Sequence, residues 1–208
     1  MRYALLLVLL LLSNPTMFGQ IEVFNTIKKL PISDSLKMVK IDSLLDENLN
    51  NGSLTDLELV SGKYANWLYK TKNLQKALAA LKLNIEYHTG GKIKLQKQLY
   101  KAGQFAFFDH NFSTSVSFFK KAVELDAQNV VAGKSYIELG RNYYYLGDYY
   151  RSIEYFELGE TLLSDLEDYN QVARGYLNSI NPYRTLKTES TLAKLYLSLI
   201  HISEPTRR

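Results

Sequence analysis

The chain has 208 residues, of which 46% are hydrophobic and 22% are charged, and its formal net charge is +4. This composition indicates a folded chain and excludes an intrinsically disordered one. The chain contains no cysteine, which excludes disulfides, thiolate metal sites, a cysteine nucleophile and a lipid-modified cysteine. The net charge falls to +2 when the terminal segments described below are set aside, so it gives no argument for nucleic acid or acidic membranes.

The first residues have the layout of a secretory signal peptide. A short basic segment with Arg2 precedes an apolar run from Ala4 to Leu12, and Gly19 provides a small residue for cleavage. Met17 stands where a small side chain is expected, so an uncleaved signal anchor remains the alternative. We expect residues 1–19 to be removed and the mature protein to be periplasmic or secreted. No later segment approaches the roughly 18 apolar residues of a membrane span.

Residues 20–53 are expected to form an N-terminal segment with one helix. It would run from Asp34 to Asn48 behind the N-cap Ser33, with Leu36, Val39, Leu44 and Leu45 on its apolar face. Helical periodicity then predicts pairs of helices, separated by breaks at residues 50–52 and 89–91. The predicted pairs cover residues 54–70 and 73–88, 91–109 and 112–126, and 131–146 and 149–165.

A fourth unit is expected after Glu167, in one of two registers. In the preferred register, Tyr169 to Ile180 is the first helix, Asn181-Pro182 is the turn, and the second helix starts at Tyr183. In the other register, Leu192, Ala193 and Tyr196 belong to the first helix of a unit that is cut off.

The helix pairs repeat a pattern of small and aromatic residues. It is plainest in the third pair, and two weaker copies precede it. From Ala65 to Gly103 is a step of 38 residues, and from Gly103 to Gly140 a step of 37. The third copy carries large aromatic residues, a Leu-Gly pair and a small serine at Tyr136, Leu139, Gly140, Tyr143, Gly147, Asp148, Tyr149, Ser152, Phe156 and Gly159.

This pattern resembles the tetratricopeptide repeat (TPR), whose ideal period is about 34 residues. The resemblance implies an all-α, right-handed superhelical array of antiparallel helix pairs over residues 54–196, with three to four units. Gly103 in the second unit and Gly140 in the third would be small because the second helix of the unit crosses over them. Ser115 and Ser152 would be small because they lie on that second helix at the crossing.

The sequence offers no catalytic or metal-binding constellation. His88 at a helix end and His110 in a turn have no second histidine or carboxylate at ligand spacing, so solvent-exposed or capping roles are expected. Gly90-Gly91-Lys92 lacks the spacing of a phosphate-binding loop. We expect a non-enzymatic protein without cofactor or metal.

The resemblance places the functional surface in the concave groove, which the first helix of each unit lines. An aromatic groove with amide and basic groups suits an extended peptide or a helix of acidic character. Packing between units is the alternative role for its aromatic residues. The groove positions of this chain are Asn66, Tyr69, Lys70, Lys97, Tyr100, Gln104, Phe107, Phe108, Ile137, Arg141, Tyr144 and Tyr145.

The resemblance implies a protein-interaction scaffold that binds a protein or peptide partner. The alternative is a sensory or regulatory ectodomain whose output domain, a histidine kinase, a transcription regulator or a protease, is missing. A helical-repeat glycan-binding lipoprotein is disfavoured by the missing cysteine.

The last residues resemble a translated sequencing-library adaptor. The match covers Leu197 to Arg207, so residues 197–208 are expected to be a non-native tail and the array to end near Tyr196. An array cut there lacks a polar capping helix, which predicts marginal stability or self-association through the uncapped end.

Overall fold

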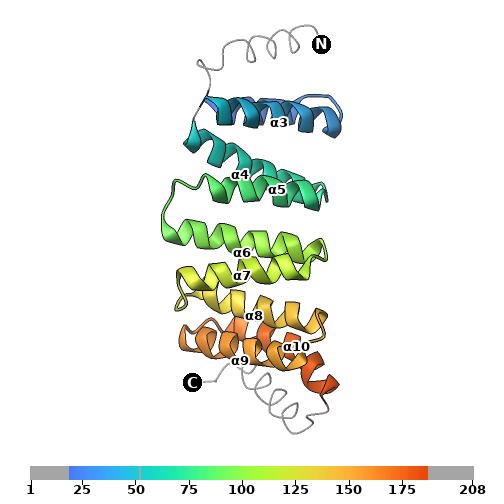
Figure 1. Cartoon of the computed structure of the whole chain (residues 1–208), viewed down its shortest axis with the longest axis vertical. Helices are drawn as coiled ribbons and strands as arrows, with labels where there is room; N and C mark the ends of the chain where they lie inside the picture. Colours follow the sequence, from blue (N-terminus) through green and yellow to red (C-terminus); the bar gives the residue numbers. More distant parts are fainter. Residues whose placement is uncertain (1–18, 52, 187–208) are drawn as a thin grey trace, which may run out of the picture. The chain divides into compact units, whose positions relative to one another are not determined.

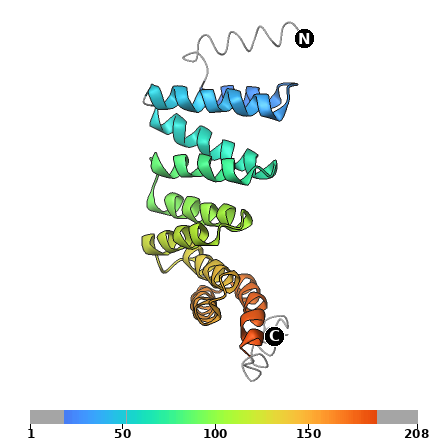
Figure 2. The same ribbon diagram turned by 45° about the vertical axis from the view of Figure 1, so that its right-hand side comes forward.

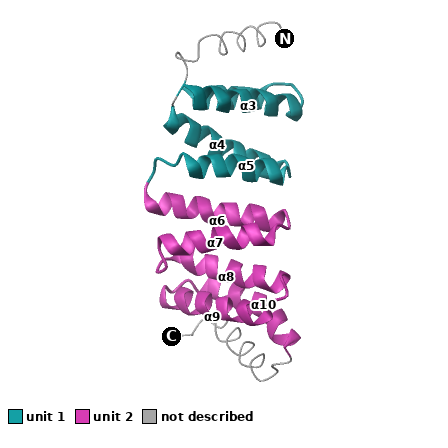
Figure 3. Ribbon diagram, viewed as in Figure 1, with its two compact units in different colours: residues 1–90 teal, residues 91–208 magenta. Residues whose placement is uncertain are grey.

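The computed structural model describes residues 19–51 and 53–186, and within these ranges all regular structure is α-helical (Figure 1). The described helices fall into two compact units, residues 1–90 and residues 91–208 (Figure 3). This confirms the predicted all-α fold class. The expected signal segment before Gly19, the register through Leu192 and Tyr196, and the expected tail lie outside the described residues.

Unit 1 contains α2 (Gln20–Lys29), α3 (Asp34–Asn50), α4 (Leu54–Lys70) and α5 (Leu74–Glu86). Helices α4 and α5 form the predicted pair, and α2 and α3 pack against each other and against α4. The side chains at the centre of this unit are fully or almost fully buried; they include Phe24, Ile41, Leu57, Tyr64, Leu68 and Leu81.

Helix α2 was not predicted, because we expected only one helix in residues 20–53. It is short, and its N-cap Gly19 provides no side-chain hydrogen bond, so the usual signal for a helix start is missing. Its buried residues Val23, Phe24 and Ile27 lie on one helical face. Burial of that face, rather than capping, therefore stabilises α2.

Unit 2 contains α6 (Lys92–Phe108), α7 (Phe112–Leu125), α8 (Val130–Tyr145), α9 (Tyr149–Asp165) and α10 (Tyr169–Thr185). Helices α6 and α7 form one antiparallel pair and α8 and α9 the next, as predicted, with ends that shift by a few residues. The turned view separates α9, seen nearly end-on, from α10 (Figure 2).

The predicted turn at Asn181-Pro182 is wrong, because Pro182 lies inside α10 and the helix continues to Thr185. Proline removes one backbone donor and crowds the carbonyl of the preceding turn. That penalty falls in the last turn of α10, where Pro182 and Tyr183 are both buried. The Tyr183 hydroxyl also donates to Glu157 of α9 at 2.7 Å. These contacts offset the lost backbone hydrogen bond, so no second helix begins at Tyr183.

The small residues of the repeat act as predicted. A Cβ added at Gly103 would lie 2.8 Å from the ring of Phe119, and one at Gly140 would lie 2.8 Å from the ring of Phe156. The Ser115 hydroxyl donates to the carbonyl of Gly103 at 2.8 Å. The Ser152 hydroxyl donates to the carbonyl of Gly140 at the same distance. Each pair thus meets through a glycine on its first helix and a serine on its second.

Four tight turns among the described residues share one backbone design. The residue after each C-cap has a positive φ, and the next residue donates its N–H to a carbonyl five positions back. This is the Schellman arrangement, which satisfies the last carbonyls of a helix. The positive-φ residues and the N-cap residues that follow them are Lys72 and Asn73, His110 and Asn111, Gly147 and Asp148, and Glu167 and Asp168.

Replacing Lys72 by glycine is expected to raise the free energy of unfolding by about 0.5–1 kcal/mol. Lys72 is exposed and has a φ of 60°, a region that strains side chains but not glycine. Gly147 has a φ of 80° in the equivalent turn, so Gly147→Ala should lower the free energy of unfolding by about 1 kcal/mol. Urea titrations of both variants measure the shifts, and two shifts of the same sign would contradict this account.

Candidate partner-binding face of the first helices

In unit 2 the first helices of successive pairs lie next to one another. Helix α8 contacts both α6 and α10, whereas α7 packs on α6 and α8, and α9 on α8 and α10. We use the name α6–α8–α10 face for a set of accessible side chains on these three first helices, together with the buried Glu138 that lies between them. Its side chains are Lys97, Tyr100, Gln104 and Phe108 of α6, Lys134, Glu138, Arg141 and Tyr145 of α8, and Arg174 of α10.

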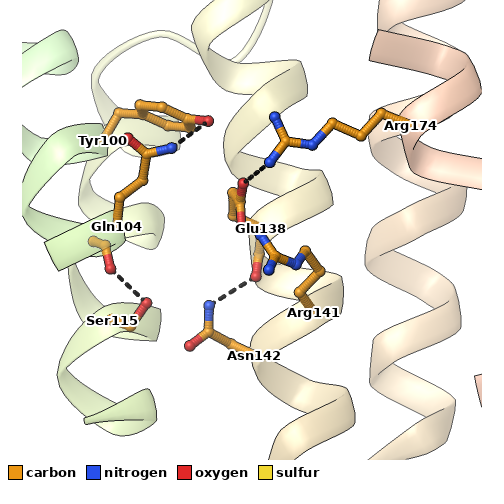
Figure 4. Close-up of polar contacts among 8 residues, drawn as sticks. Tyr100, Gln104, Ser115, Glu138, Arg141, Asn142 and Arg174 are labelled. Carbon is orange, nitrogen blue, oxygen red and sulfur yellow. Dashed lines mark hydrogen bonds and ion pairs between the residues drawn. The ribbon is translucent and has the colours of Figure 1, made fainter. Parts of the chain in front are cut away.

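Glu138 is the centre of this face and connects two repeats. Its side chain is only 3% exposed, and it accepts from Arg141 on its own helix at 2.6 Å and from Arg174 on α10 at 3.3 Å (Figure 4). One buried carboxylate therefore fixes two guanidinium groups. Both arginines remain partly accessible, since the side chains of Arg141 and Arg174 are 22% and 49% exposed.

Tyr100 and Gln104 of α6 border this ionic cluster (Figure 4). The Gln104 side-chain amide donates to the Tyr100 hydroxyl at 3.2 Å. The pKa of Tyr100 is raised to about 12, mainly by burial and in smaller part by the charge of Glu138, while the charges of Arg174 and Arg141 oppose the rise. Tyr100 is therefore a neutral hydroxyl at physiological pH, and its ring packs edge-on against Phe119 of α7.

Aromatic rings gather at the C-terminal ends of α6 and α8. Phe107 lies edge-on to both Phe112 and Tyr145, with ring centroids 5.5 and 5.4 Å away. Phe112 and Tyr145 stack almost in parallel, at 5.0 Å and 9°. The Arg141 guanidinium lies 4.4 Å from the centre of the Phe107 ring. Arg141 thus links the aromatic cluster to Glu138.

Two of the expected groove residues are buried, and their assignment is corrected. Ile137 is 3% exposed and packs in a core cluster with Phe156, Leu163 and Val172. Gly175 of α10 lies against Ile137 and covers it. Phe107 is 8% exposed, beneath the aromatic cluster. Both side chains pack between repeats, which was the alternative role given for aromatic residues such as Phe107 but not for Ile137.

The other residues expected in unit 2 are at least partly accessible. Lys97, Phe108 and Tyr145 are exposed, whereas Tyr100, Gln104 and Arg141 are half-buried. Tyr144 is also half-buried, and its ring lies 5.7 Å from that of Tyr149 on α9. The side chains of Tyr100 and Gln104 are hydrogen-bonded to each other, and Arg141 is connected to Tyr145 through the Phe107 ring. Their role in binding remains a prediction.

Three expected groove residues belong to unit 1. Tyr69 and Lys70 at the end of α4 are exposed, and Asn66 one turn earlier is half-buried. By the repeat spacing, Asn66 and Lys70 correspond to the accessible Gln104 and Phe108 of α6, whereas Tyr69 corresponds to the buried Phe107.

Sequence reasoning missed Glu138 and Arg174. Charged residues on amphipathic helices are usually solvated, and we interpreted them so. One signal was available, because Glu138 and Arg174 are 36 residues apart, close to one repeat. Residues one repeat apart lie on adjacent first helices, so a pair of opposite charges at that spacing predicts an inter-repeat salt bridge.

His88 was expected to be solvent-exposed or a cap, but its side chain is only 8% exposed. Its Nδ1 lies 2.8 Å from Oε1 of Glu58, which is itself buried in α4. Thr89 donates both its backbone N–H and its hydroxyl to the other oxygen of Glu58, at 3.2 and 2.6 Å. These bonds attach the segment after α5 to α4, which is a structural role within unit 1.

Residues 19–51 and 53–186 contain no group of three or more histidine, cysteine, aspartate and glutamate side chains that could hold a metal ion. No helix in the described part of the chain is long and apolar enough to cross a membrane.

Comparison with solved structures shows close similarity of fold at low sequence identity. The crystal structure of MamA aligns with a TM-score of 0.63 and 14% identity, over 92% of each chain. The TPR-like repeats of a putative kinesin light chain from Podosopora anserina align with a TM-score of 0.64 and 11% identity, over 97% of this chain and 93% of that one. The fold is that of a TPR solenoid.

A third similar structure is a larger protein. It is a Signal Transduction ATPase with Numerous Domains from Pyrococcus horikoshii, described as having a tetratricopeptide repeat sensor. The solenoid aligns with it at a TM-score of 0.62 and 16% identity, over 97% of this chain but only 36% of that one. No protein-family model and no curated protein matches the sequence. Identities of this size establish the fold alone.

Proposed function

We propose that the solenoid is a protein-interaction scaffold that binds a peptide or protein partner on the α6–α8–α10 face, without catalysing a reaction. The observation that carries this proposal is the pairing of fixed, accessible arginines with exposed aromatic rings on one face. Phe108 and Tyr145 are 47% and 57% exposed, and both rings contact Phe107, over which the Arg141 guanidinium lies. Tyrosine and arginine are enriched among the residues that dominate binding energy at protein interfaces.

The charge of the face supports a partner of acidic character. Lys97, Lys134, Arg141 and Arg174 are basic and Glu138 is acidic, and Lys134 is paired with Asp168, the N-cap of α10, at 3.8 Å. Opposite charge on a partner speeds association and orients it.

Alanine at both Arg141 and Tyr145 is expected to weaken partner binding by at least about tenfold, because interface residues of these types often contribute more than 1 kcal/mol each. Peptides selected from a random displayed library against the full chain provide the ligands, and biolayer interferometry measures their affinities. The far-UV circular dichroism of the variant should remain that of the parent protein.

The matched control carries Lys121→Ala and Tyr150→Ala. Lys121 of α7 and Tyr150 of α9 are exposed on the second helices, and they supply the same two kinds of side chain. Its affinity for the selected peptides should equal that of the parent. Equal affinity of the Arg141/Tyr145 variant and this control would overturn the assignment of the face.

A second candidate function is a sensory or regulatory domain joined to an output domain. The Pyrococcus horikoshii protein supports it, since its tetratricopeptide repeat sensor is part of a much longer chain. The segment from Leu197 to Arg207 resembles a translated adaptor, so the native gene beyond Tyr196 is the region to sequence. Sequencing the native gene past the codon for Tyr196 would reveal a kinase, a transcription-regulator or a protease domain, and a stop codon directly after the repeats would exclude all three.

We also propose export to the periplasm or the cell exterior, on the strength of the basic and apolar layout of residues 1–19. N-terminal sequencing of the protein recovered from the periplasm of an expressing bacterium should begin at Gln20. An intact Met1 in the cytosolic fraction would overturn this proposal.

A further inference from the structure

We infer that α10 is a helix whose docking is controlled by a proton. It stays packed against α8 and α9 while the Glu160 carboxyl of α9 is protonated, and it is released when that carboxyl loses its proton. The inference concerns the internal contacts of unit 2 and does not depend on the proposed function.

Glu160 lies where α9 and α10 pack tightly. A Cβ added at Gly175 of α10 would lie 2.8 Å from the Glu160 side chain and 2.7 Å from that of Ile137 on α8. The backbone of α10 therefore covers the carboxyl, and Oε1 of Glu160 has no hydrogen-bond partner among the described residues. A negative charge there would be removed from water without a partner, which is strongly unfavourable while α10 is docked.

The polar groups of α9 and α10 around Glu160 give a negative charge little support. Glu157 of α9 is a second carboxylate, and it accepts from the Tyr183 hydroxyl of α10 at 2.7 Å. The Ser179 hydroxyl of α10 interacts with Glu160 but also donates to the backbone carbonyl of Tyr176 at 2.9 Å. The pKa of Glu160 is accordingly raised to about 8, mainly by burial.

Helix α8 contributes the apolar isoleucine named above to this contact, and its charged side chains are paired elsewhere. Lys134 lies 3.8 Å from Asp168 at the start of α10. Glu138 forms its salt bridges with Arg141 and Arg174. The basic groups of α8 and α10 in these pairs are therefore already engaged by other carboxylates.

The helical structure of α10 depends on its docking. Its 17 residues include a glycine, a proline and three asparagines, which all have low helix propensity: Gly175, Pro182, Asn170, Asn178 and Asn181. A helix of this length is marginal in water even with better helix formers. Release of α10 from α9 should therefore also unfold it.

Release of α10 would change unit 2 in two ways. It would uncover Ile137, which Gly175 now covers, and it would break the 3.3 Å salt bridge between Arg174 and Glu138. Helices α8 and α9 would keep their own contact, in which the Phe156 ring packs against Gly140. The rest of the unit can therefore stay folded while α10 is detached.

Hydrogen–deuterium exchange of the full chain, followed by mass spectrometry of proteolytic fragments, tests this release. The protection factor of a fragment is its intrinsic exchange rate divided by its measured rate, so the pH dependence of the exchange chemistry cancels. Docked α10 retains the Glu160 proton up to about pH 8, whereas the released state loses it near the ordinary value of 4.5. Docking therefore weakens as pH rises, and protection of α10 should fall by up to about tenfold per unit between pH 6 and 8.

Fragments from α7 provide the internal reference, and their protection should stay constant over the same pH range. Glu160→Gln keeps the shape of the side chain but cannot ionise, so protection of α10 in this variant should not depend on pH. Glu154→Gln, at an exposed position of α9, should retain the fall seen in the parent.

Each other outcome overturns a stated part of the inference. A parallel fall of protection in α7 and α10 would show that the unit unfolds as a whole and that α10 is not released separately. Constant protection of α10 in the parent, or the same fall in Glu160→Gln, would exclude Glu160 as the controlling group. No partner is present in these measurements, so none of the outcomes bears on the binding face.

Discussion

Gly140→Ser is expected to lower the free energy of unfolding by about 3 kcal/mol or more. A Cβ at this position would lie 2.8 Å from the ring of Phe156, which is completely buried. The ring cannot retreat, because it belongs to the core cluster with Ile137 and Leu163. Inserting atoms into a packed core forces backbone shifts, and here the shift would separate α8 from α9. Urea titration followed by circular dichroism measures the loss.

Gly91→Ser is the matched control for that substitution. Gly91 has a φ of −76°, and a Cβ added there meets no atom within 4 Å. It is the N-cap of α6, a position where serine is favourable. This variant should be as stable as the parent or slightly more stable. A similar loss of stability in both variants would show that the close contact between Gly140 and Phe156 is not the cause of the loss.

The second large effect is a loss of stability with rising pH that originates at Glu160. This residue of α9 is 7% exposed and lies beneath Gly175 of α10. Its Oε1 has no hydrogen-bond partner in the described part of the chain. The pKa of Glu160 is raised from 4.5 to about 8, mainly by burial; the Ser179 side chain partly opposes this rise, and the charge of Glu157 contributes to it.

The sign of the pH effect follows from the two pKa values. Below the unfolded value of 4.5, Glu160 is protonated in both states and contributes no pH dependence. Between 4.5 and about 8 the unfolded chain releases the proton while the folded chain retains it, so the free energy of unfolding falls as pH rises. Each pH unit contributes at most about 1.4 kcal/mol.

Glu160→Gln removes this proton and should flatten the pH profile. At pH 8 we expect the variant to be more stable than the parent by about 2–4 kcal/mol, and at pH 4 the two should differ little. Glu154→Gln, an exposed position on the same helix, is the control and should keep the parent's profile. Urea titrations from pH 4 to 8 measure the free energy of unfolding of both proteins. If it depends on pH in the same way in the parent and in Glu160→Gln, Glu160 is not a buried neutral carboxyl.

The sequence predicted the features that one repeat encodes by itself. Gly103 and Gly140, with Ser115 and Ser152, recur at a fixed distance because each helix pair needs the same close crossing. That regularity identified the helix pairs and the fold. The prediction was wrong at α10. Proline usually ends a helix, but here the burial of Pro182 and Tyr183 stabilises the helix beyond the proline.

The candidate site was harder to predict, because it depends on contacts between repeats. Ile137 and Arg141 are one helical turn apart, and position along α8 alone does not distinguish them. Gly175 allows α10 to approach α8 closely and to cover Ile137, whereas the side chain of Arg141 remains 22% exposed. Glu138 looked like an ordinary surface carboxylate until Arg174 of the next helix was placed beside it.

The four turns built around Lys72, His110, Gly147 and Glu167 bear on how the chain folds during its synthesis. Each is closed by a backbone hydrogen bond between residues only five apart, so it can form without any distant segment. Contacts between neighbouring segments are the ones that form fastest. A ribosome releasing α6, α7, α8, α9 and α10 in that order would deliver each helix next to the one it packs against. The growing chain can therefore bury its apolar surface one helix at a time.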